Sequence, residues 1–191
     1  MRREPALKRT VAFVDGQNLF HGARSVFGHR HPDFDVLALA TEVCTREGLR
    51  LVETRFYTGV PVPSEDSFWS AFWRAKTAVM GRQGVRVITR PLRRGREKGI
   101  DVRIAIDVIR MAHRRELDAA LVFSQDQDLA EVADEIRLIS REQDRWVRIL
   151  SAFPWSAQAE NQEGTARTDW IRIDRATYDR CLDRRDYRPS R

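Results

Sequence analysis

The sequence predicts an α/β protein with a mainly parallel central sheet, and three observations support this. Segments rich in β-branched and aromatic residues alternate with segments whose apolar residues recur at helical spacing, which is typical of βαβ units. Two of the strand-like segments, 10–14 and 121–123, are almost entirely apolar, as in strands that are buried on both faces. At 191 residues, the chain has the length of one domain with a well-buried core.

The individual elements follow from local patterns along the chain. The predicted strands are short apolar or alternating runs; they cover residues 10–14, 49–60, 85–89, 119–123, 146–150 and 170–173. The predicted helices carry apolar residues three and four positions apart; they cover 19–27, 36–44, 64–82, 100–113 and 128–140, with a short helix in 174–183. The helix over 64–82 is expected to begin at a Ser-x-x-Ser cap.

Three connecting segments are rich in Gly, Pro or small polar residues and are predicted to be loops; they cover residues 28–33, 90–99 and 156–168. We expect the last of them to be a mobile loop near the sheet edge. The chain as a whole is then a single domain over 1–191, with a core of about 8–175 and a short C-terminal helix and tail.

An aromatic stripe lies on the predicted helix 64–82. Four large rings occupy one helix face; they are Phe68, Trp69, Phe72 and Trp73. Such rings can stack on nucleic-acid bases, but the same spacing is typical of core packing. The prediction for this stripe is core.

Charge and cysteine content narrow the class of partner and the compartment. The net charge is +6 and the pI is about 10, which favours polyanions such as nucleic acid. Cys44 and Cys181 lie far apart with no zinc-ligand spacing, so the expected location is a reducing cytoplasm. No apolar run is long enough for a signal-peptide core or a membrane span, so no membrane partner is expected. A homo-oligomer is compatible with these features.

Acidic residues follow two of the predicted strands directly. Asp15 comes after strand 10–14, and Asp126 and Asp128 come after strand 119–123. Because parallel strands end at the same edge of a sheet, these carboxylates are expected to converge there, where open α/β folds bind ligands. Carboxylates within about 4–6 Å of one another resist ionisation unless a cation lies among them. The pattern therefore indicates a divalent-metal site.

Most of these acidic residues also have a purely structural explanation. Asp15 and Asn18 could form a turn in which Asn18 caps the next helix. Asp128 has Glu131 three positions later, which is the spacing of a capping box. Asp101 begins a predicted helix, where the helix dipole stabilises a carboxylate whatever its role.

Asp107 and the histidines are assigned no role in the site. Asp107 interrupts an apolar run of helix 100–113, but Arg103 and Arg110 can pair with it, so a helix-surface ion pair is the preferred interpretation. The four histidines show neither metal-ligand spacing nor an adjacent nucleophile; they are His21, His29, His31 and His113.

Three ordered blocks resemble a known family. They are residues 13–19 (Phe-Val-Asp-Gly-Gln-Asn-Leu), 98–102 (Lys-Gly-Ile-Asp-Val) and 121–129 (Leu-Val-Phe-Ser-Gln-Asp-Gln-Asp-Leu). They resemble the signature blocks of NYN-domain (LabA-like) proteins of the PIN-like nuclease superfamily, and residues 168–179 resemble the tail of a bacterial subgroup. The resemblance implies a Rossmann-like, PIN-type α/β/α sandwich whose aspartates bind Mg²⁺ or Mn²⁺ and hydrolyse phosphodiesters, usually of RNA.

Carried over block by block, the resemblance also implies the site residues. The expected catalytic residues are Asp15, Asn18, Asp101, Asp126 and Asp128. The four aspartates would be the metal ligands, and Asn18 would orient a ligand water or a phosphate oxygen. The chain departs from the family pattern at Gln125, where Gly is common, and at Leu129, where Phe is usual. The side chain of Gln125 would narrow the approach of a phosphate or alter the metal geometry.

A basic cluster precedes Asp101 in the sequence. It comprises Arg93, Arg94, Arg96 and Lys98. These residues would hold the phosphate backbone beside Asp101 without reading base sequence. A solvated basic loop without a function is an equally good interpretation.

These features predict a metal-dependent ribonuclease, expected to act as an endoribonuclease. A haloacid-dehalogenase-type phosphatase also begins with a strand ending in Asp, but that family resembles this chain only in the first Asp of its Asp-x-Asp motif. The second Asp of the motif would fall at position 17, where this chain has Gln17. The more serious alternative is a non-catalytic nucleic-acid-binding or regulatory module of the same fold. Gln125 favours that alternative, whereas Asp15, Asp126 and Asp128 argue against it.

Overall fold

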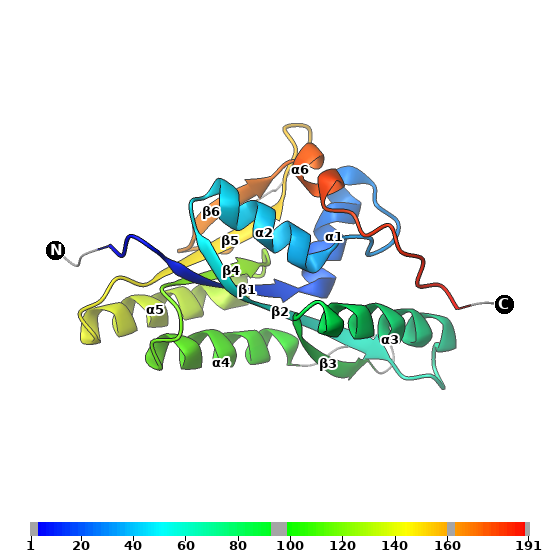
Figure 1. The fold of residues 1–191 in the computed structure, drawn as a ribbon, viewed down its shortest axis with the longest axis horizontal. Coiled ribbons are helices and arrows are strands. Elements are labelled where there is room, and N and C mark those ends of the chain that lie inside the picture. Colours follow the sequence, from blue (N-terminus) through cyan, green and yellow to red (C-terminus); the bar gives the residue numbers. More distant parts are fainter. Residues whose placement is uncertain (1–3, 93–98, 160–162, 190–191) are drawn as a thin grey trace.

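The computed structural model describes residues 4–92, 99–159 and 163–189, and its core is one six-stranded sheet (Figure 1). All neighbouring strands are parallel, and their order is β3-β2-β1-β4-β5-β6. The strands are β1 (Arg9–Asp15), β2 (Arg50–Pro61), β3 (Arg86–Leu92), β4 (Ala119–Phe123), β5 (Arg148–Pro154) and β6 (Asp169–Ile173). The predicted α/β fold with a parallel sheet is confirmed.

Helices cover both faces of the sheet (Figure 1). They are α1 (Gly16–Phe27), α2 (Val36–Arg46), α3 (Ser67–Arg82), α4 (Ile100–His113), α5 (Ala130–Glu142) and α6 (Arg175–Arg180). Residues of α1, α2, α3 and α6 pack in one apolar cluster, and residues of α4 and α5 pack in the other. None of the helices in the described part of the chain is both long and apolar enough to span a bilayer.

Strand β1 lies in the middle and is buried on both faces. Ala12 and Val14 pack in the α1–α3 cluster, whereas Val11 and Phe13 pack in the α4–α5 cluster. Because successive side chains of a strand point to opposite faces, a strand covered by helices on both sides needs apolar residues at every position. This explains the nearly continuous apolar run in the sequence.

The strand order reverses between β1 and β4. From β1 the chain proceeds outward through β2 to β3, and it then returns to the centre at β4 and proceeds to β5 and β6 on the other side. The carboxyl ends of β1 and β4 therefore flank the topological switch point, where open α/β sheets bind their ligands. Asp15 ends β1, and Ser124 follows the last residue of β4.

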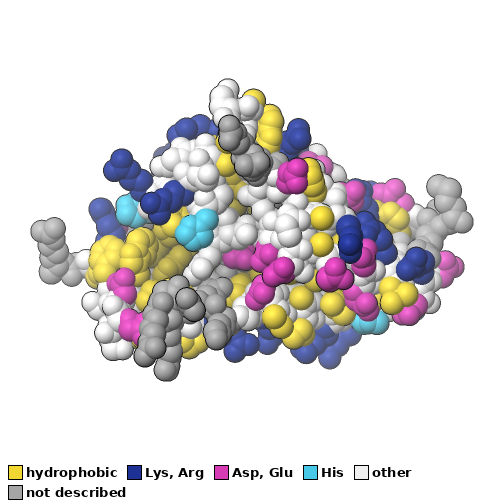
Figure 2. All heavy atoms as spheres, turned by 180° about the vertical axis from the view of Figure 1, so that it is seen from behind, with side chains coloured by type: hydrophobic (Ala, Val, Ile, Leu, Met, Phe, Trp, Pro, Cys, Tyr) yellow, Lys and Arg dark blue, Asp and Glu magenta, His cyan; other side chains and the backbone are white. Residues whose placement is uncertain are grey.

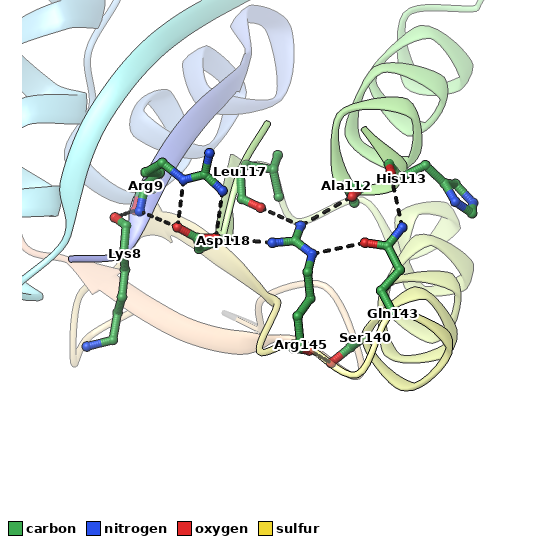
Figure 3. Close-up of polar contacts among 10 residues, drawn as sticks. Lys8, Arg9, Ala112, His113, Leu117, Asp118, Ser140, Gln143 and Arg145 are labelled. Atoms are coloured by element: carbon green, nitrogen blue, oxygen red, sulfur yellow. Dashed lines mark hydrogen bonds and ion pairs between the residues drawn. The ribbon is translucent and has the colours of Figure 1, made fainter. Parts of the chain in front are cut away.

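The amino edge of the same strands is held by a polar network (Figure 3). Asp118, just before β4, accepts three hydrogen bonds from Arg9, one from its backbone N–H and two from its guanidinium, each at 3.0 Å. Arg145 donates to Asp118 at 3.1 Å, and also to the carbonyls of Ala112 and Leu117. This network joins the start of β1, the start of β4 and the chain beyond α5.

Several predicted boundaries are wrong by a few residues. Helix α3 begins later than expected, because Asp66 caps it by accepting from the backbone N–H of Trp69, rather than Ser64. Strand β5 covers 148–154 rather than 146–150, because pairing with β4 begins at Arg148. Helix α5 begins at Ala130, after a short 3₁₀ turn over Gln127–Leu129.

The aromatic stripe of α3 is core only in part. Phe72 and Trp73 are buried, as predicted. Phe68, however, is 41% exposed, and Trp69 is half-buried at the surface. The prediction is therefore wrong for Phe68, whereas Trp69 packs against the core and stays partly exposed.

Candidate active site

Asp15 lies at the centre of the candidate site. It is 8% exposed, and its Oδ1 atom accepts hydrogen bonds from the backbone N–H groups of Gln17 (3.1 Å) and Asn18 (3.0 Å), which caps α1. Burial, together with the negative charges of Asp126 and Asp101, raises the pKa of Asp15 from its ordinary value near 3.8 to about 6, although the two backbone hydrogen bonds oppose this. Within the described ranges, no basic side chain forms an ion pair with Asp15.

Asn18 joins the two central strand ends. Its Oδ1 atom accepts a hydrogen bond from the backbone N–H of Gln125 at 2.9 Å, so α1 is tied to the turn after β4. The cap of α1 is Asp15, and the interpretation of Asn18 as the capping residue is wrong. The side chain of Asn18 is thus already engaged in fixing the site, and any contact with a ligand water or phosphate stays a prediction.

Asp126 and Asp128 lie in the turn after β4. The Oδ1 atom of Asp126 accepts from the backbone N–H of Asp128 at 3.0 Å, so Asp126 caps the 3₁₀ turn. Asp126 is half-buried, whereas Asp128 is exposed. A capping box between Asp128 and Glu131 is not formed, because α5 begins at Ala130 and has no side-chain cap.

Asp101 belongs to the helical layer of α4 and α5, on the other face of the sheet from α1. It lies in the first turn of α4, whose preceding residue Gly99 has φ of +81°, a conformation that glycine adopts without strain. The charge of Asp101 is one of those that raise the pKa of Asp15. Carboxylates of the turn after β4 and of α4 thus both act electrostatically on the carboxylate that ends β1.

Asp107 belongs to a different, buried group. It is 2% exposed, and its Oδ2 atom accepts from the Tyr57 hydroxyl (3.0 Å) and from Nε of Arg103 (3.0 Å), with the Arg55 guanidinium 3.5 Å away. The predicted pairing with Arg103 is confirmed, but its predicted location on the helix surface is wrong. Burial and the charge of Asp107 both raise the pKa of Tyr57, so its hydroxyl remains a donor.

Residues 163–168, which we call the returning segment, follow β5 and fix the turn after β4. The sequence did not predict this arrangement. The Thr165 hydroxyl donates to the carbonyls of Ser124 (3.4 Å) and Asp126 (3.0 Å). Ser151, in the middle of β5, donates to the Ser124 carbonyl at 2.6 Å and accepts from the Thr165 N–H at 3.1 Å. Residues 160–162 of the predicted mobile loop lie outside the described residues, but Glu163, Gly164, Thr165 and Ala166 form hydrogen bonds with the turn after β4. The one sequence feature that could have indicated this contact is Ser151, a polar residue within the apolar run of β5.

The side chain of Gln125 contacts helix α1 and the segment that follows β5. Its Nε2 atom donates to the Glu163 carbonyl at 2.9 Å, and its Oε1 atom lies 3.3 Å from where a Cβ on Gly22 would be. The side chain therefore lies between α1 and the returning segment. In this position it joins the turn after β4 to both of these segments.

Gly16 is required by close packing rather than by backbone conformation. A Cβ at this position would lie 2.5 Å from the ring of Phe56 and 3.0 Å from the carbonyl oxygen of Tyr57. Phe56 is a fully buried residue of β2. The backbone that follows Asp15 therefore rests directly on the core.

The donor atoms of this region suit a hard divalent cation. Mg²⁺ prefers oxygen ligands and keeps several waters, and a buried carboxylate whose pKa is raised by neighbouring carboxylates gains from a bound cation. Across the described ranges, no three or more His, Cys, Asp or Glu side chains are already arranged around one point. The aspartates are the residues that would hold such an ion. The basic cluster of Arg93, Arg94, Arg96 and Lys98 lies outside the described residues.

Comparison with known proteins gives the family. The family model described as the NYN domain matches residues 9–166, which include all three sequence blocks and the returning Thr165. No curated protein matches the sequence closely enough to count as a relative. Among solved structures, the chain is similar to a protein of unknown function, VPA0982, from Vibrio parahaemolyticus, with a TM-score of 0.57 and 18% identity over 91% of this chain and 98% of that one, which shows a shared fold. The chain belongs to the NYN domain family, within the PIN-like nuclease superfamily.

Proposed function

We propose that this protein is a divalent-metal-dependent ribonuclease that hydrolyses phosphodiester bonds within RNA. The observation that carries the proposal is Asp15, a buried carboxylate at the switch point of a parallel sheet, which is paired with no cation in the described chain and whose pKa is raised by burial and by the charges of Asp126 and Asp101. Membership of the NYN family supports the same reaction class.

The proposed ligands of Mg²⁺ or Mn²⁺ are Asp15, Asp101 and Asp126, with Asp128 at the exposed rim. A bound ion would activate a water and stabilise the charge that develops on the phosphoryl oxygens. The protein's own residues contribute by positioning the metal-binding carboxylates. Asn18 and Thr165 hold the turn that carries Asp126, so the backbone of this residue is fixed in the absence of substrate.

Phosphate binding is assigned to the basic cluster of residues 93–98. Neutralising Arg93, Arg94 and Arg96 together should weaken binding of single-stranded RNA. It should also lower the slope of log affinity against log salt by about 0.7 for each phosphate that the protein no longer neutralises. Fluorescence anisotropy at several salt concentrations measures this slope, and an unchanged slope would leave the cluster as a solvated loop.

The direct test is cleavage of an end-labelled RNA pool with Mg²⁺, with Mn²⁺ and with excess chelator. We expect internal cleavage that depends on the metal and that returns when the chelator is saturated. Equal cleavage in chelator would contradict the mechanism. Isothermal titration with Mn²⁺ gives a second readout, which does not depend on choosing the right RNA.

A non-catalytic RNA-binding module is the second candidate. It is favoured by the absence, from the described residues, of a ready group of three or more metal-binding side chains. This candidate predicts tight, metal-independent RNA binding with no cleavage in either metal. We also propose a cytoplasmic location, since Cys44 and Cys181 are both free and buried.

A further inference from the structure

A cavity of about 300 Å³ opens beside Asp15, between α1, α3 and the carboxyl ends of β2 and β3. Its wall begins at Gly16 and Gln17, the two residues that follow Asp15. The other lining residues are Phe20, His21, Pro32, Gly59, Pro61, Asp66, Trp69, Trp73 and Leu92. In Figure 2, hydrophobic side chains gather with histidines beside them at the end of the molecule where Figure 1 places α3 and β3.

The aromatic wall of this cavity is held in place by its neighbours. Trp69 packs edge-on against Phe68 (ring centroids 5.5 Å apart) and Phe72 (5.1 Å), and the ring of His31 lies 6.1 Å away. Its backbone N–H donates to Asp66 at 3.0 Å. Because packing already restricts the indole, stacking a ligand on it costs little conformational entropy.

The described polar groups of the wall suit a neutral ring better than a phosphate. None of the described lining residues is Lys or Arg, and the carboxylate of Asp66 would repel an anion. Gln17 and Asp66 instead offer hydrogen-bonding groups to the edge of a planar ligand. The volume lies at the lower end of the range for small-ligand pockets, about 300–1,000 Å³, which suits one ring system.

We propose that this cavity holds one unpaired nucleobase of the strand that is cleaved at Asp15, stacked on Trp69. The proposal rests on the proposed function and adds to it the part of the protein that binds a base. A base inside a duplex is already stacked and paired, so only single-stranded or looped RNA can place a base there while its backbone passes the end of β1.

The test is an abasic scan of a short single-stranded RNA, with binding measured in chelator so that no cleavage occurs. Removing the base at one position should weaken binding by about 5- to 150-fold, the range measured for base–aromatic stacking. In Trp69→Leu the intact RNA should bind more weakly by a similar factor, and the penalty at that one position should disappear. Trp69→Phe keeps a ring and should keep most of the penalty.

Trp146→Leu is the matched control, because Trp146 comes just before β5 at the amino edge of the sheet. It should leave the abasic pattern unchanged. Equal binding of duplex and single strand, or an abasic penalty that persists in Trp69→Leu, would overturn the inference. So would a protein dimer that Trp69→Leu dissociates, since the cavity would then hold part of a second copy.

These experiments distinguish failure of the nuclease proposal from failure of the base-pocket proposal. Metal-dependent cleavage with no position-specific abasic effect would leave the nuclease standing and remove the base pocket. A position-specific effect that disappears in Trp69→Leu, without cleavage in any metal, would keep the pocket and reject catalysis.

Discussion

Two buried aspartates lie at opposite ends of the same central strands, and their surroundings differ. Asp118, 7% exposed, precedes β4 at the amino edge; Asp15, 8% exposed, ends β1 at the carboxyl edge. Asp118 is bound by the guanidinium groups of Arg9 and Arg145 (Figure 3). Asp15 is bound only by two backbone N–H groups in the described structure.

The electrostatic consequences are opposite. Burial tends to raise the pKa of Asp118, but the hydrogen bonds and charge of Arg9, with the charge of Arg145, lower it below its ordinary value. Burial raises the pKa of Asp15 to about 6, and Asp126 and Asp101 add to the effect. Burial therefore does not distinguish a structural carboxylate from a functional one. The distinction lies in whether the fold supplies its own cation.

The largest expected effect is on catalysis. Asp15→Asn and Asp126→Asn should each lower the cleavage rate by more than about 100-fold, because even changes to residues behind metal ligands cost about 10- to 100-fold. Asparagine also caps helices, so the fold should persist, as circular dichroism can check. Glu116→Gln, an exposed carboxylate near the amino edge, is the control. Near-normal cleavage by Asp15→Asn would remove Asp15 from the mechanism.

At the amino edge, the expected effect is on stability. Asp118→Asn should lower the free energy of unfolding by about 3 kcal/mol, because it leaves the charges of Arg9 and Arg145 largely uncompensated. Urea denaturation at pH 7 measures this. Asp186→Asn, which removes an exposed pair with Arg188, should leave the midpoint unchanged. The cleavage rate per folded molecule should not change in either variant. A specific loss of cleavage in Asp118→Asn would contradict the assignment of stability to the amino edge and catalysis to the carboxyl edge.

The two carboxylates should also give opposite pH dependences of stability. The folded pKa of Asp15 exceeds its unfolded value, so its favourable contribution is present below about pH 4 and is lost as the pH rises through about 6. Asp15→Asn should therefore be more stable than the wild type at pH 8, by on the order of 1–3 kcal/mol, with no gain at pH 4. Asp118, with a lowered pKa, contributes above its unfolded pKa and loses that contribution on acidification. Melting temperatures at both pH values, without divalent metal, test the sign, and a gain for Asp15→Asn that grows toward low pH would contradict it.

The smallest expected effects are those of substituting Asp101 and Asp107, two carboxylates on α4. Asp101→Asn should weaken Mn²⁺ binding and cleavage with little effect on stability. Asp107→Asn should keep Mn²⁺ binding and lower the free energy of unfolding by about 2 kcal/mol, because it removes the charge that Arg103 and Tyr57 bind. Calorimetric Mn²⁺ titration of both variants decides between them, and loss of binding in Asp107→Asn alone would reverse the assignment.

Local patterns in the sequence predicted the fold because its central strands are unusual. The apolar runs of β1 and β4 require burial on both faces, and this in turn requires a parallel sheet with helices on either side. The same rule brings Asp15 and Asp126 to one edge. The boundaries of β5 were predicted less well, because its start is fixed by pairing with β4 and not by its own residues.

Contacts between distant segments could not be predicted. The bond from Thr165 to Ser124 spans 41 residues, and that from Tyr57 to Asp107 spans 50. Neither segment carries a periodic pattern that indicates its partner. Asp107 therefore suggested a surface ion pair, although Tyr57 and Arg55 of β2 bury it.

Gly16 has a consequence for the way heat would inactivate the protein. The chain just after Asp15 rests on Phe56, so the backbone that carries this carboxylate cannot move toward the core unless an interior side chain moves as well. Many sites on loops lose their geometry at temperatures where the fold persists. Here, loss of activity and loss of cooperative structure should occur at one temperature, and the unheated protein should hold Asp15 in position before any substrate arrives.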